Sequence, residues 1–391
     1  MKNKEANSAI SGKGDSFGTL LIHNGHETDP VTGALGTAII QTSTFDQGDL
    51  SEEREFDYAR SGNPTRKALE ETIALLEGGE KAYAFGSGIA AVSSCLGIFS
   101  AGDHIIAAED IYGGSRRILN TFYKRWGMEL TAVDTTDSEN IRRAVKSNTK
   151  ALLLETPSNP LLKITDLKTC LDFARDAGLI SIVDNTFMTP YFQRPIELGA
   201  DIVVHSATKF LGGHSDVISG LAVTRTAELG DKVYAVQNGF GAVPGPWDCW
   251  LILRGIKTLK VRLDAQQASA IKIARYLSTH KNVEAVYYPG LDNHPGKTIH
   301  DAQSTGPGAV LSFKTKSAEH ALRFLGQTRL AASAVSLGGV ETIASYPVRM
   351  SHASVPVEER RRLGITDSLI RISVGLEADD DLIEDFNHAL E

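Results

Sequence analysis

The 391-residue chain has few cysteines, no excess of basic residues and no long hydrophobic run. Cys95, Cys170 and Cys249 form no CxxC pair, which excludes a disulfide framework and a cysteine zinc site and fits a reducing cytoplasm. With 40 basic and 48 acidic residues, the net charge is -8, so we expect no broad nucleic-acid-binding face. No apolar run reaches the ~18 residues of a membrane span, and the polar start, Met1–Gly18, lacks the apolar core of a secretory signal. These absences favour a cytoplasmic globular enzyme or binding protein.

Short apolar runs alternate with helical patterns between about residues 58 and 224. Runs that are apolar on both faces are typical of buried parallel strands. The alternation predicts an α/β fold, a mostly parallel sheet with helices on both faces. The expected strands are Ala82–Phe85, Ile105–Ala108, Ala151–Leu154, Ile180–Val183 and Ile202–Val204, with helices at Ala90–Phe99, Arg116–Trp126, Ile141–Val145 and Leu167–Ala177.

The pattern changes after about Gly241, where loop punctuation precedes a long helical stretch, Trp247 to Leu277. Later strands at Val283–Tyr288, Ala309–Phe313 and Ile370–Val374 are interspersed with helices, which is typical of a smaller α+β domain. We therefore expect three parts. They are an N-terminal arm at 1–57, a large ligand-binding domain at 58–241 and a small C-terminal domain at 242–391.

Three motifs admit other interpretations. Gly86–Ala91 fits G-x-G-x-x-A after a strand, and Glu109 follows at roughly the spacing of a dinucleotide fingerprint, which keeps an NAD-dependent dehydrogenase as a different class of function. Ser206–Lys209 fits the S-x-x-K of serine-acylating enzymes, but the companion motifs are absent. His205 and His214 belong to no HExxH motif or histidine cluster, so no metal site is expected.

Polar residues follow two neighbouring strands of the expected sheet. One run contains Asp184 and the other contains Lys209, and the carboxyl ends of parallel strands share one crevice. Lys209 lies among small and apolar residues, where an amine loses its proton more readily and becomes a nucleophile or base. Asp184 can face a cationic ligand nitrogen. The structural alternatives are a solvated surface lysine and a helix-capping aspartate.

Pyridoxal 5′-phosphate (PLP) is the cofactor that needs these groups together. It requires a lysine for a Schiff base and an aspartate against its pyridinium nitrogen. The Gly88 and Ile89 amides at a helix start, with the Ser206 and Thr208 hydroxyls, would form a phosphate cup. Tyr112 follows the strand Ile105–Ala108 and is the candidate for stacking on the ring. A non-catalytic PLP-binding protein remains a further alternative.

With these residues, the chain resembles the transsulfuration group of fold-type I PLP enzymes. This family comprises cystathionine γ-synthase, γ-lyase and β-lyase, together with methionine γ-lyase. The resemblance covers about Ile22 to Leu390. The motifs that carry it are Tyr58–Thr65, Phe85–Ala91, Glu155–Pro160, Val183–Phe187, His205–Lys209 and Arg371–Gly375.

The resemblance implies a role for each site residue. Lys209 would bind PLP covalently and act as base, and Tyr112 would stack on the ring and assist proton transfer. Ile89 stands where the family commonly has Met, and Arg117 and Val335 would lie near the distal end of the substrate. A homodimer would be the active unit, within a homotetramer. The other implied cofactor contacts are Asp184, Ser87, Gly88, Ser206 and Thr208, with Tyr58 and Arg60 from a neighbouring subunit; the implied substrate-carboxylate contacts are Asn159, Ser336 and Arg371.

The departures from each family pattern bear on the reaction. Gly114 and Gln237-Asn238 differ from the methionine γ-lyase pattern, and, like Gly241–Pro244 and Trp247–Cys249, are similar to the cystathionine-processing members. Val335 stands where γ-acting members usually carry Glu, which admits β-lyase activity. We expect a PLP-dependent carbon–sulfur lyase that cleaves cystathionine by γ-elimination to cysteine, 2-oxobutanoate and ammonia. Side activity on cysteine or homocysteine would release hydrogen sulfide. The alternatives are cystathionine β-lyase, giving homocysteine and pyruvate, then cystathionine γ-synthase or methionine γ-lyase.

Overall fold

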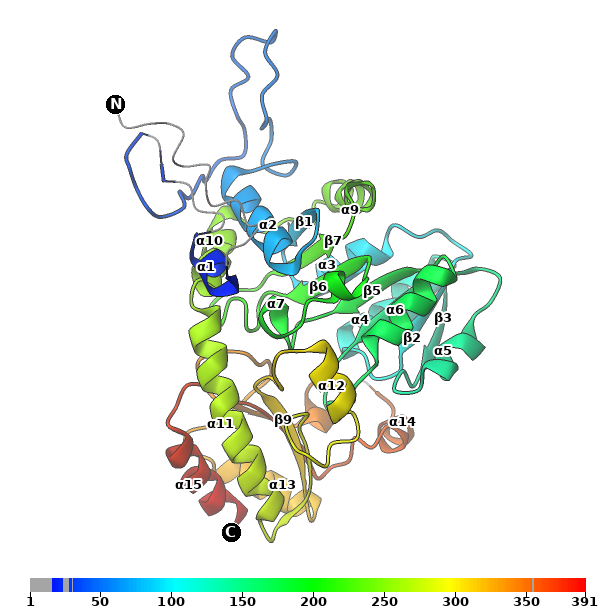
Figure 1. The fold of residues 1–391 in the computed structure, drawn as a ribbon, viewed down its shortest axis with the longest axis vertical. Helices are drawn as coiled ribbons and strands as arrows, with labels where there is room; N and C mark the ends of the chain where they lie inside the picture. Colours follow the sequence, from blue (N-terminus) through cyan, green and yellow to red (C-terminus); the bar gives the residue numbers. More distant parts are fainter. Residues whose placement is uncertain (1–15, 24–27, 30, 354) are drawn as a thin grey trace.

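The computed structural model describes residues 16–23, 28–29, 31–353 and 355–391 (Figure 1). Most of the polar start, Met1–Gly18, and part of the expected arm at 1–57 lie outside these ranges. Among the described residues, no helix combines the length and apolar character needed to cross a membrane.

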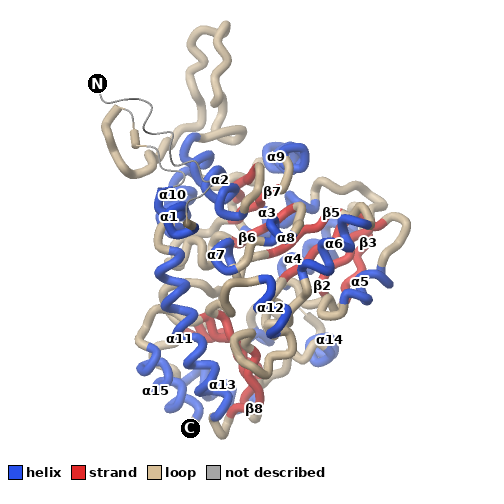
Figure 2. Tube along the Cα trace, viewed as in Figure 1, coloured by secondary structure: helices blue, strands red, loops and turns tan. Residues whose placement is uncertain are grey.

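A seven-stranded sheet, in the order β1-β7-β6-β5-β4-β2-β3, forms the larger layer of the molecule. The strands from β2 to β6 run parallel, whereas β7 is antiparallel to both β1 and β6. The predicted fold class, a mostly parallel sheet covered by helices, is confirmed (Figure 2). The bounds are β1 (Lys81–Phe85), β2 (His104–Ala108), β3 (Glu129–Val133), β4 (Thr149–Glu155), β5 (Ile180–Asp184), β6 (Ile202–Ser206) and β7 (Gly220–Thr224).

Alternate residues of these strands belong to two hydrophobic clusters, one on each face of the sheet. Ile105 in β2 and Leu153 in β4 belong to one cluster, whereas their neighbours Ile106 and Leu152 belong to the other. Successive side chains on a strand point to opposite faces, so both faces must be covered by helices. One face packs on α3 (Gly88–Leu96), α4 (Gly113–Ile118) and α9 (Ala227–Phe240), and the other on α5 (Ser138–Ala144), α6 (Leu167–Asp176) and α8 (Pro195–Leu198).

Helix ends follow from local sequence. The Asn63 side chain accepts hydrogen bonds from the Thr65 and Arg66 amides at the start of α2 (Pro64–Glu77), which ends at Gly78 in the left-handed conformation. The predicted helix Arg116–Trp126 differs from the structure: α4 begins earlier, at Gly113, and continues as a π-helical turn, η1 (Leu119–Tyr123). A π turn has no signature in apolar spacing, which explains why the sequence pattern did not predict η1.

A five-stranded, mainly antiparallel sheet, in the order β10-β11-β12-β9-β8, forms the smaller layer. Helix α11 links the layers, because its first turns share a core with α2 and α10, whereas Ala270 and later residues join the core of the small sheet. The boundaries expected at residues 57 and 241 remain predictions. The bounds are α1 (Phe17–His23), α7 (Thr189–Phe192), α10 (Pro246–Ile256), α11 (Leu259–Thr279), β8 (Val283–Tyr287), α12 (Lys297–Gln303), β9 (Val310–Thr315), α13 (Ala318–Gln327), β10 (Ala332–Ser333), β11 (Ile343–Ser345), the 3₁₀ turn η2 (Pro347–Arg349), α14 (Val357–Arg362), β12 (Leu369–Ser373) and α15 (Asp379–Leu390).

A two-legged loop projects from the body before α2 (Figure 1). Its legs are joined by backbone hydrogen bonds between Phe45 and Asp57 and between Ala59 and Ser43. The Arg66 guanidinium donates to the Ala59 and Arg60 carbonyls and so fixes the base of the loop to α2.

Candidate active site

The carboxyl ends of three parallel strands bring polar side chains to one edge of the large sheet. Strand β4 ends at Glu155, β5 at Asp184 and β6 at Ser206, and Glu155 pairs in register with Asp184. Lys209 follows β6 in a turn, and its backbone amide donates a hydrogen bond to the Ser206 carbonyl. This edge is the usual ligand-binding position of open α/β sheets.

Asp184 is held by Thr186. The Thr186 amide and hydroxyl both donate to Asp184 Oδ1, at 3.0 and 2.5 Å. Burial raises the pKa of the Asp184 carboxyl, and the hydrogen bonds from Thr186 oppose that shift. Thr186 Oγ1 also accepts a bond from the Ser206 amide at 2.8 Å, which ties the end of β6 to the end of β5.

Glu155 is a member of this site to which sequence reasoning gave no role. Its carboxyl is buried, and its Oε2 accepts a hydrogen bond of 2.7 Å from the Tyr112 amide. Burial, and then the neighbouring charge of Asp184, raises the pKa of Glu155 well above its usual range. The pKa values of both adjacent carboxyl groups are thus raised by burial, and the upward shift is larger for Glu155. Its place in the motif Glu155–Pro160 was the available signal.

Lys209 meets the small domain at Ser336. The Lys209 ammonium donates to Ser336 Oγ at 2.6 Å. Burial, and then the charge of Arg371, lowers the pKa of Lys209 to about 8, so its amine is deprotonated far more often than that of a surface lysine near neutral pH. Ser336 has a φ of 87°, an unusual backbone conformation for a non-glycine residue that concentrates at functional sites.

Arg371 is a buried cation whose hydrogen-bond partners are uncharged. Its Nη1 donates to Asn159 Oδ1 at 2.9 Å, and its Nη2 donates to the Ser336 carbonyl at 2.6 Å and to Ser345 Oγ at 3.1 Å. Burial lowers the pKa of Arg371 to about 10, so it remains protonated at neutral pH. A buried guanidinium whose hydrogen-bond partners are uncharged is suited to an incoming carboxylate. The structure thus brings together Asn159, Ser336 and Arg371; Ser345 is an additional contact.

The start of α3 and the end of β6 approach each other closely. A Cβ added at Gly88 would lie 2.7 Å from the Ser206 Cβ, so only glycine allows this approach. The Ser87 side chain caps α3 by accepting from the Ala90 amide, and Ile89 follows in its first turn. Thr208 Oγ1 exchanges hydrogen bonds with the Ser219 backbone. A helix start with free amides and neighbouring hydroxyls fits a phosphate group.

Tyr112 immediately precedes α4, makes no capping hydrogen bond with its side chain, and is 45% exposed. A Cβ at Gly114 would lie 2.4 Å from Tyr112 Cε1, so the ring occupies the space that a larger residue at 114 would need. Arg117, on the same helix, and Val335, beside Ser336, are exposed.

Tyr58 and Arg60 lie at the base of the projecting loop. Arg60 Nε donates to Asn238 Oδ1 on α9 at 3.2 Å, and the guanidinium lies 5.5 Å from the centre of the Tyr58 ring. Within the described residues of one chain, their side chains form no hydrogen bond or ion pair with the groups around Lys209.

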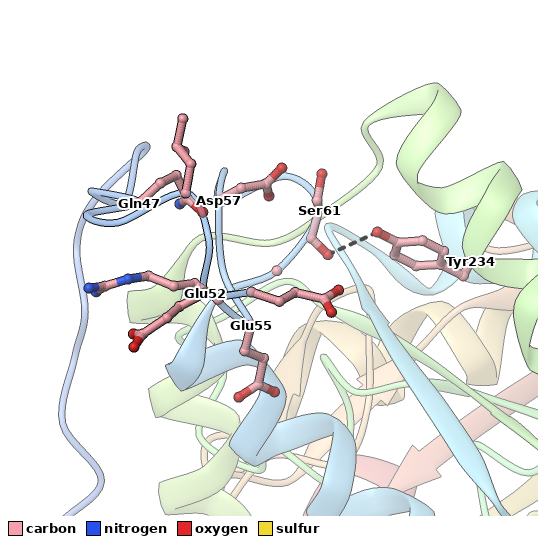
Figure 3. A pocket seen from close by; sticks show the side chains of 10 residues that line it. Gln47, Glu52, Glu55, Asp57, Ser61 and Tyr234 are labelled. Carbon is pink, nitrogen blue, oxygen red and sulfur yellow. Dashed lines mark hydrogen bonds between the residues drawn. The ribbon is translucent and has the colours of Figure 1, made fainter.

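A separate cavity of about 480 Å³ opens beside the projecting loop (Figure 3). It is bounded on one side by Tyr234, whose hydroxyl donates to the Ser61 carbonyl. Acidic side chains dominate the rest of its lining, which disfavours a phosphate, so it is not the cofactor site. Its acidic members are Glu52, Glu53, Glu55 and Asp57.

A partly buried lysine of lowered pKa, an acidic strand end and a glycine-cradled helix start define the site of a PLP-dependent enzyme. Comparison with known proteins agrees: the model of the Cys/Met metabolism PLP-dependent enzyme family matches residues 18–391. The chain belongs to this family, which confirms the predicted family and cofactor.

The relatives include cystathionine lyases of both types and, among solved structures, a cystathionine gamma synthase from Xanthomonas oryzae pv. oryzae with a TM-score of 0.94 and 39% identity, covering 96% of this chain and 98% of that one. The chain is 52% identical over 372 residues to a cystathionine beta-lyase of Bacillus subtilis, covering 95% of each chain. It is 51% identical over 373 residues to a cystathionine gamma-lyase of the same organism, covering 95% of this chain and 98% of the relative. The solved structure of cystathionine gamma-lyase from Lactobacillus plantarum, complexed with L-serine, has a TM-score of 0.94 and 44% identity, covering 96% of this chain and 98% of that one.

The dinucleotide interpretation of Gly86–Ala91 is replaced by the family assignment. The acidic residue that it requires, Glu109, is already engaged. Its two carboxylate oxygens lie 3.4 Å from Lys163 Nζ and 2.7 Å from Arg362 Nη1. Glu109 is therefore paired within the protein rather than free for a ribose hydroxyl.

Proposed function

We propose that the protein is a PLP-dependent lyase that cleaves cystathionine by γ-elimination, using one water to give cysteine, 2-oxobutanoate and ammonia. The observation that carries this proposal is the contact of Lys209 Nζ with Ser336 Oγ, beside the buried cation Arg371. It supports a reactive amine and an amino-acid carboxylate site in one crevice.

PLP, when bound, supplies an electron sink for negative charge at the substrate Cα. Asp184 would face its ring nitrogen, and Ser87, Gly88, Ile89, Ser206 and Thr208 would surround its phosphate. Arg371, positioned by Asn159, would bind the substrate carboxylate in a bidentate manner. This contact selects the Cα bond that is weakened.

The proton transfers fall to two residues of the chain. Lys209, with a pKa lowered to about 8, can take the proton from Cα near neutral pH. A thiolate on Cγ departs only after a second proton leaves Cβ, so γ-elimination needs one more acid–base step than β-elimination. Tyr112, at the entrance, is the second group available to return a proton to the departing sulfur.

The β-lyase is the second candidate function, and one observation favours it. Val335 lies beside Ser336 and is 65% exposed. Because its side chain is apolar, it offers no charge to the distal amino group of cystathionine. The relatives include one lyase of each type at nearly the same identity. Gly114 and Asn238 support a cystathionine-processing enzyme over methionine γ-lyase but do not separate γ from β.

Product analysis tests the proposal. The holoenzyme is incubated with L-cystathionine, and thiols and keto acids are identified by mass spectrometry. Cysteine with 2-oxobutanoate is the expected result. Homocysteine with pyruvate would replace the γ proposal by the β-lyase, and the absence of all four products would overturn both.

Val335→Glu is expected to shift preference toward cystathionine. A carboxylate there would pair with the distal ammonium of cystathionine, contributing about 1–2 kcal/mol, or roughly 5- to 30-fold in relative kcat/KM. The kcat/KM values for cystathionine and homocysteine are compared, with Val335→Gln as the uncharged control. An equal ratio in both variants would show that residue 335 does not face the distal end of the substrate.

We further propose a cytoplasmic homo-oligomer in which Tyr58 and Arg60 complete the phosphate site of the partner subunit. Support comes from their position on a projecting loop, away from the groups around Lys209 in their own chain. A two-fold dimer would complete both sites at once. The buried free thiols of Cys95, Cys170 and Cys249 fit a reducing compartment.

Subunit mixing gives a direct prediction. Lys209→Ala and Arg60→Ala chains are each expected to be weak alone. In a hybrid dimer, one site would carry both defects and the other neither. Random exchange of equal amounts should therefore restore about a quarter of wild-type activity.

The matched control mixes Lys209→Ala with Asp184→Asn. Both of these residues belong to one chain's site, so every hybrid site retains a defect and activity should stay low. If the Arg60→Ala mixture behaves like this control despite demonstrated exchange, Arg60 acts within its own subunit or outside the site.

A further inference from the structure

A buried polar network lies directly beneath the three strand ends and takes no part in the proposed proton transfers. Its centre is Glu77, the last residue of α2, whose side chain is fully buried. Glu77 Oε1 lies 2.6 Å from His205 Nε2 and accepts a bond of 2.9 Å from Asn185 Nδ2. One carboxylate oxygen thus joins the ends of β5 and β6.

The network extends to β4 through Gln193. Gln193 Nε2 donates to Asn185 Oδ1 at 3.1 Å and to the Thr156 carbonyl at 3.3 Å. The Gln193 carbonyl accepts in turn from Asn185 Nδ2 at 2.7 Å. The network therefore spans the ends of β4, β5 and β6.

Each network residue on these strands is the sequence neighbour of a site residue. Thr156 follows Glu155, Asn185 follows Asp184, and His205 precedes Ser206. Successive side chains of an extended chain point in opposite directions, so the buried side-chain contacts of Asn185 and His205 set the positions of Asp184 and Ser206 on the site side. Thr156 is held through its backbone carbonyl. The Ser206–Thr186–Asp184 hydrogen bonds connect the same strand ends from the site side.

We propose that Glu77 is a positioning residue, which, by holding His205 and Asn185, fixes the spacing between the carboxylate of Asp184 and the phosphate-binding end of β6. This inference rests on the proposed function, since that spacing matters through the cofactor that bridges it. A buried carboxylate is costly unless it is hydrogen-bonded, and Glu77 meets this need through Oε1, since within the described residues its Oε2 has no hydrogen-bond partner.

His205 also affects the pKa of the Asp184 carboxyl. Burial is the main influence on Asp184 and raises its pKa, whereas the Thr186 hydrogen bonds and then the electrostatic interaction with His205 lower it. The contact of Glu77 with His205 therefore also bears on the ionised form of Asp184, which is the form that binds a protonated ring nitrogen.

The test uses Glu77→Gln, His205→Gln and the double variant as holoenzymes. PLP release at equilibrium and the visible absorption band of the bound cofactor are measured, with the melting temperature of each protein. We expect a rise of about 10- to 100-fold in the PLP dissociation constant for each single variant, the scale found for residues that orient the ligands of a bound metal. The effect of the double variant should fall well below the product of the two, because both changes break one network.

His104→Gln is the matched control. His104 is also fully buried in this sheet and hydrogen-bonded through both ring nitrogens, to Thr149 and Thr131. It is the first residue of β2, so it lies at the amino ends of the parallel strands, away from the site. This variant should lower the melting temperature and leave PLP affinity and the absorption band unchanged.

The proposal is overturned if the network variants behave like His104→Gln, with lowered melting temperature and wild-type PLP affinity and spectrum. If Glu77→Gln does not fold, His205→Gln decides alone, and if neither folds, the network serves folding and the proposal fails. Products from cystathionine are recorded for the wild type in parallel. A wild type that binds PLP without forming those products would defeat the proposed function and leave the positioning test intact.

Discussion

Lys209→Ala is expected to lower turnover of cystathionine by about four or more orders of magnitude while leaving the fold intact. The change removes both the amine that binds the cofactor and the base beside Cα, and groups that act as a unit lose most of the rate when one is deleted. The measurement is kcat under saturating PLP, with the melting temperature as the check on folding.

The Lys209→Arg variant distinguishes the positive charge of Lys209 from its ability to act as nucleophile and base. The guanidinium keeps the positive charge facing Ser336 but does not lose its proton near neutral pH, so it offers neither nucleophile nor base. We expect this variant to be as inactive as Lys209→Ala. Turnover near the wild-type level in either variant would contradict the role of Lys209.

Asp184→Asn is expected to retain PLP and to lower turnover by about 100-fold or more, the scale of losing one directed electrostatic contact in a buried site. An amide cannot stabilise a protonated ring nitrogen, so negative charge at Cα is less well accommodated. Both kcat and the cofactor content of the purified protein are measured.

Glu155→Gln is the control for this prediction. Glu155 lies beside Asp184 in register, and burial raises the pKa of its carboxyl; the glutamine amide keeps an oxygen that can accept from the Tyr112 amide. Its loss should stay under about tenfold. Equal losses in the two variants would show that the carboxylate charge is not specific to Asp184.

The centre of the site could be predicted from the residues because it depends on a local rule. Asp184 and Lys209 follow neighbouring apolar strands, and parallel strand ends converge. Arg371 lies on β12 of the small sheet and Ser336 in the loop between β10 and β11, far along the chain, and no spacing in the sequence brings them to Lys209. Only the resemblance pointed to them, and the structure shows Ser336 at 2.6 Å from the amine.

The sequence pattern did not predict strands β3 and β7 or a role for Glu77. Strand β3 is a half-exposed edge strand, so it lacks the fully apolar run of its neighbours. Strand β7 is buried, but its antiparallel pairing with β1 and β6 depends on partners far away in the sequence. Glu77 reads as an ordinary polar residue at a helix end, and only the fold places it under His205.

The measurement that tests the central claim most directly is the location of the cofactor on the chain. The holoenzyme is reduced with borohydride and digested, and the peptides are analysed by mass spectrometry. A pyridoxyl-phosphate adduct on Lys209, with loss of the visible absorption band, is the predicted result. An adduct on any other lysine, or an unmodified Lys209 in an enzyme inactivated by the reduction, would contradict it.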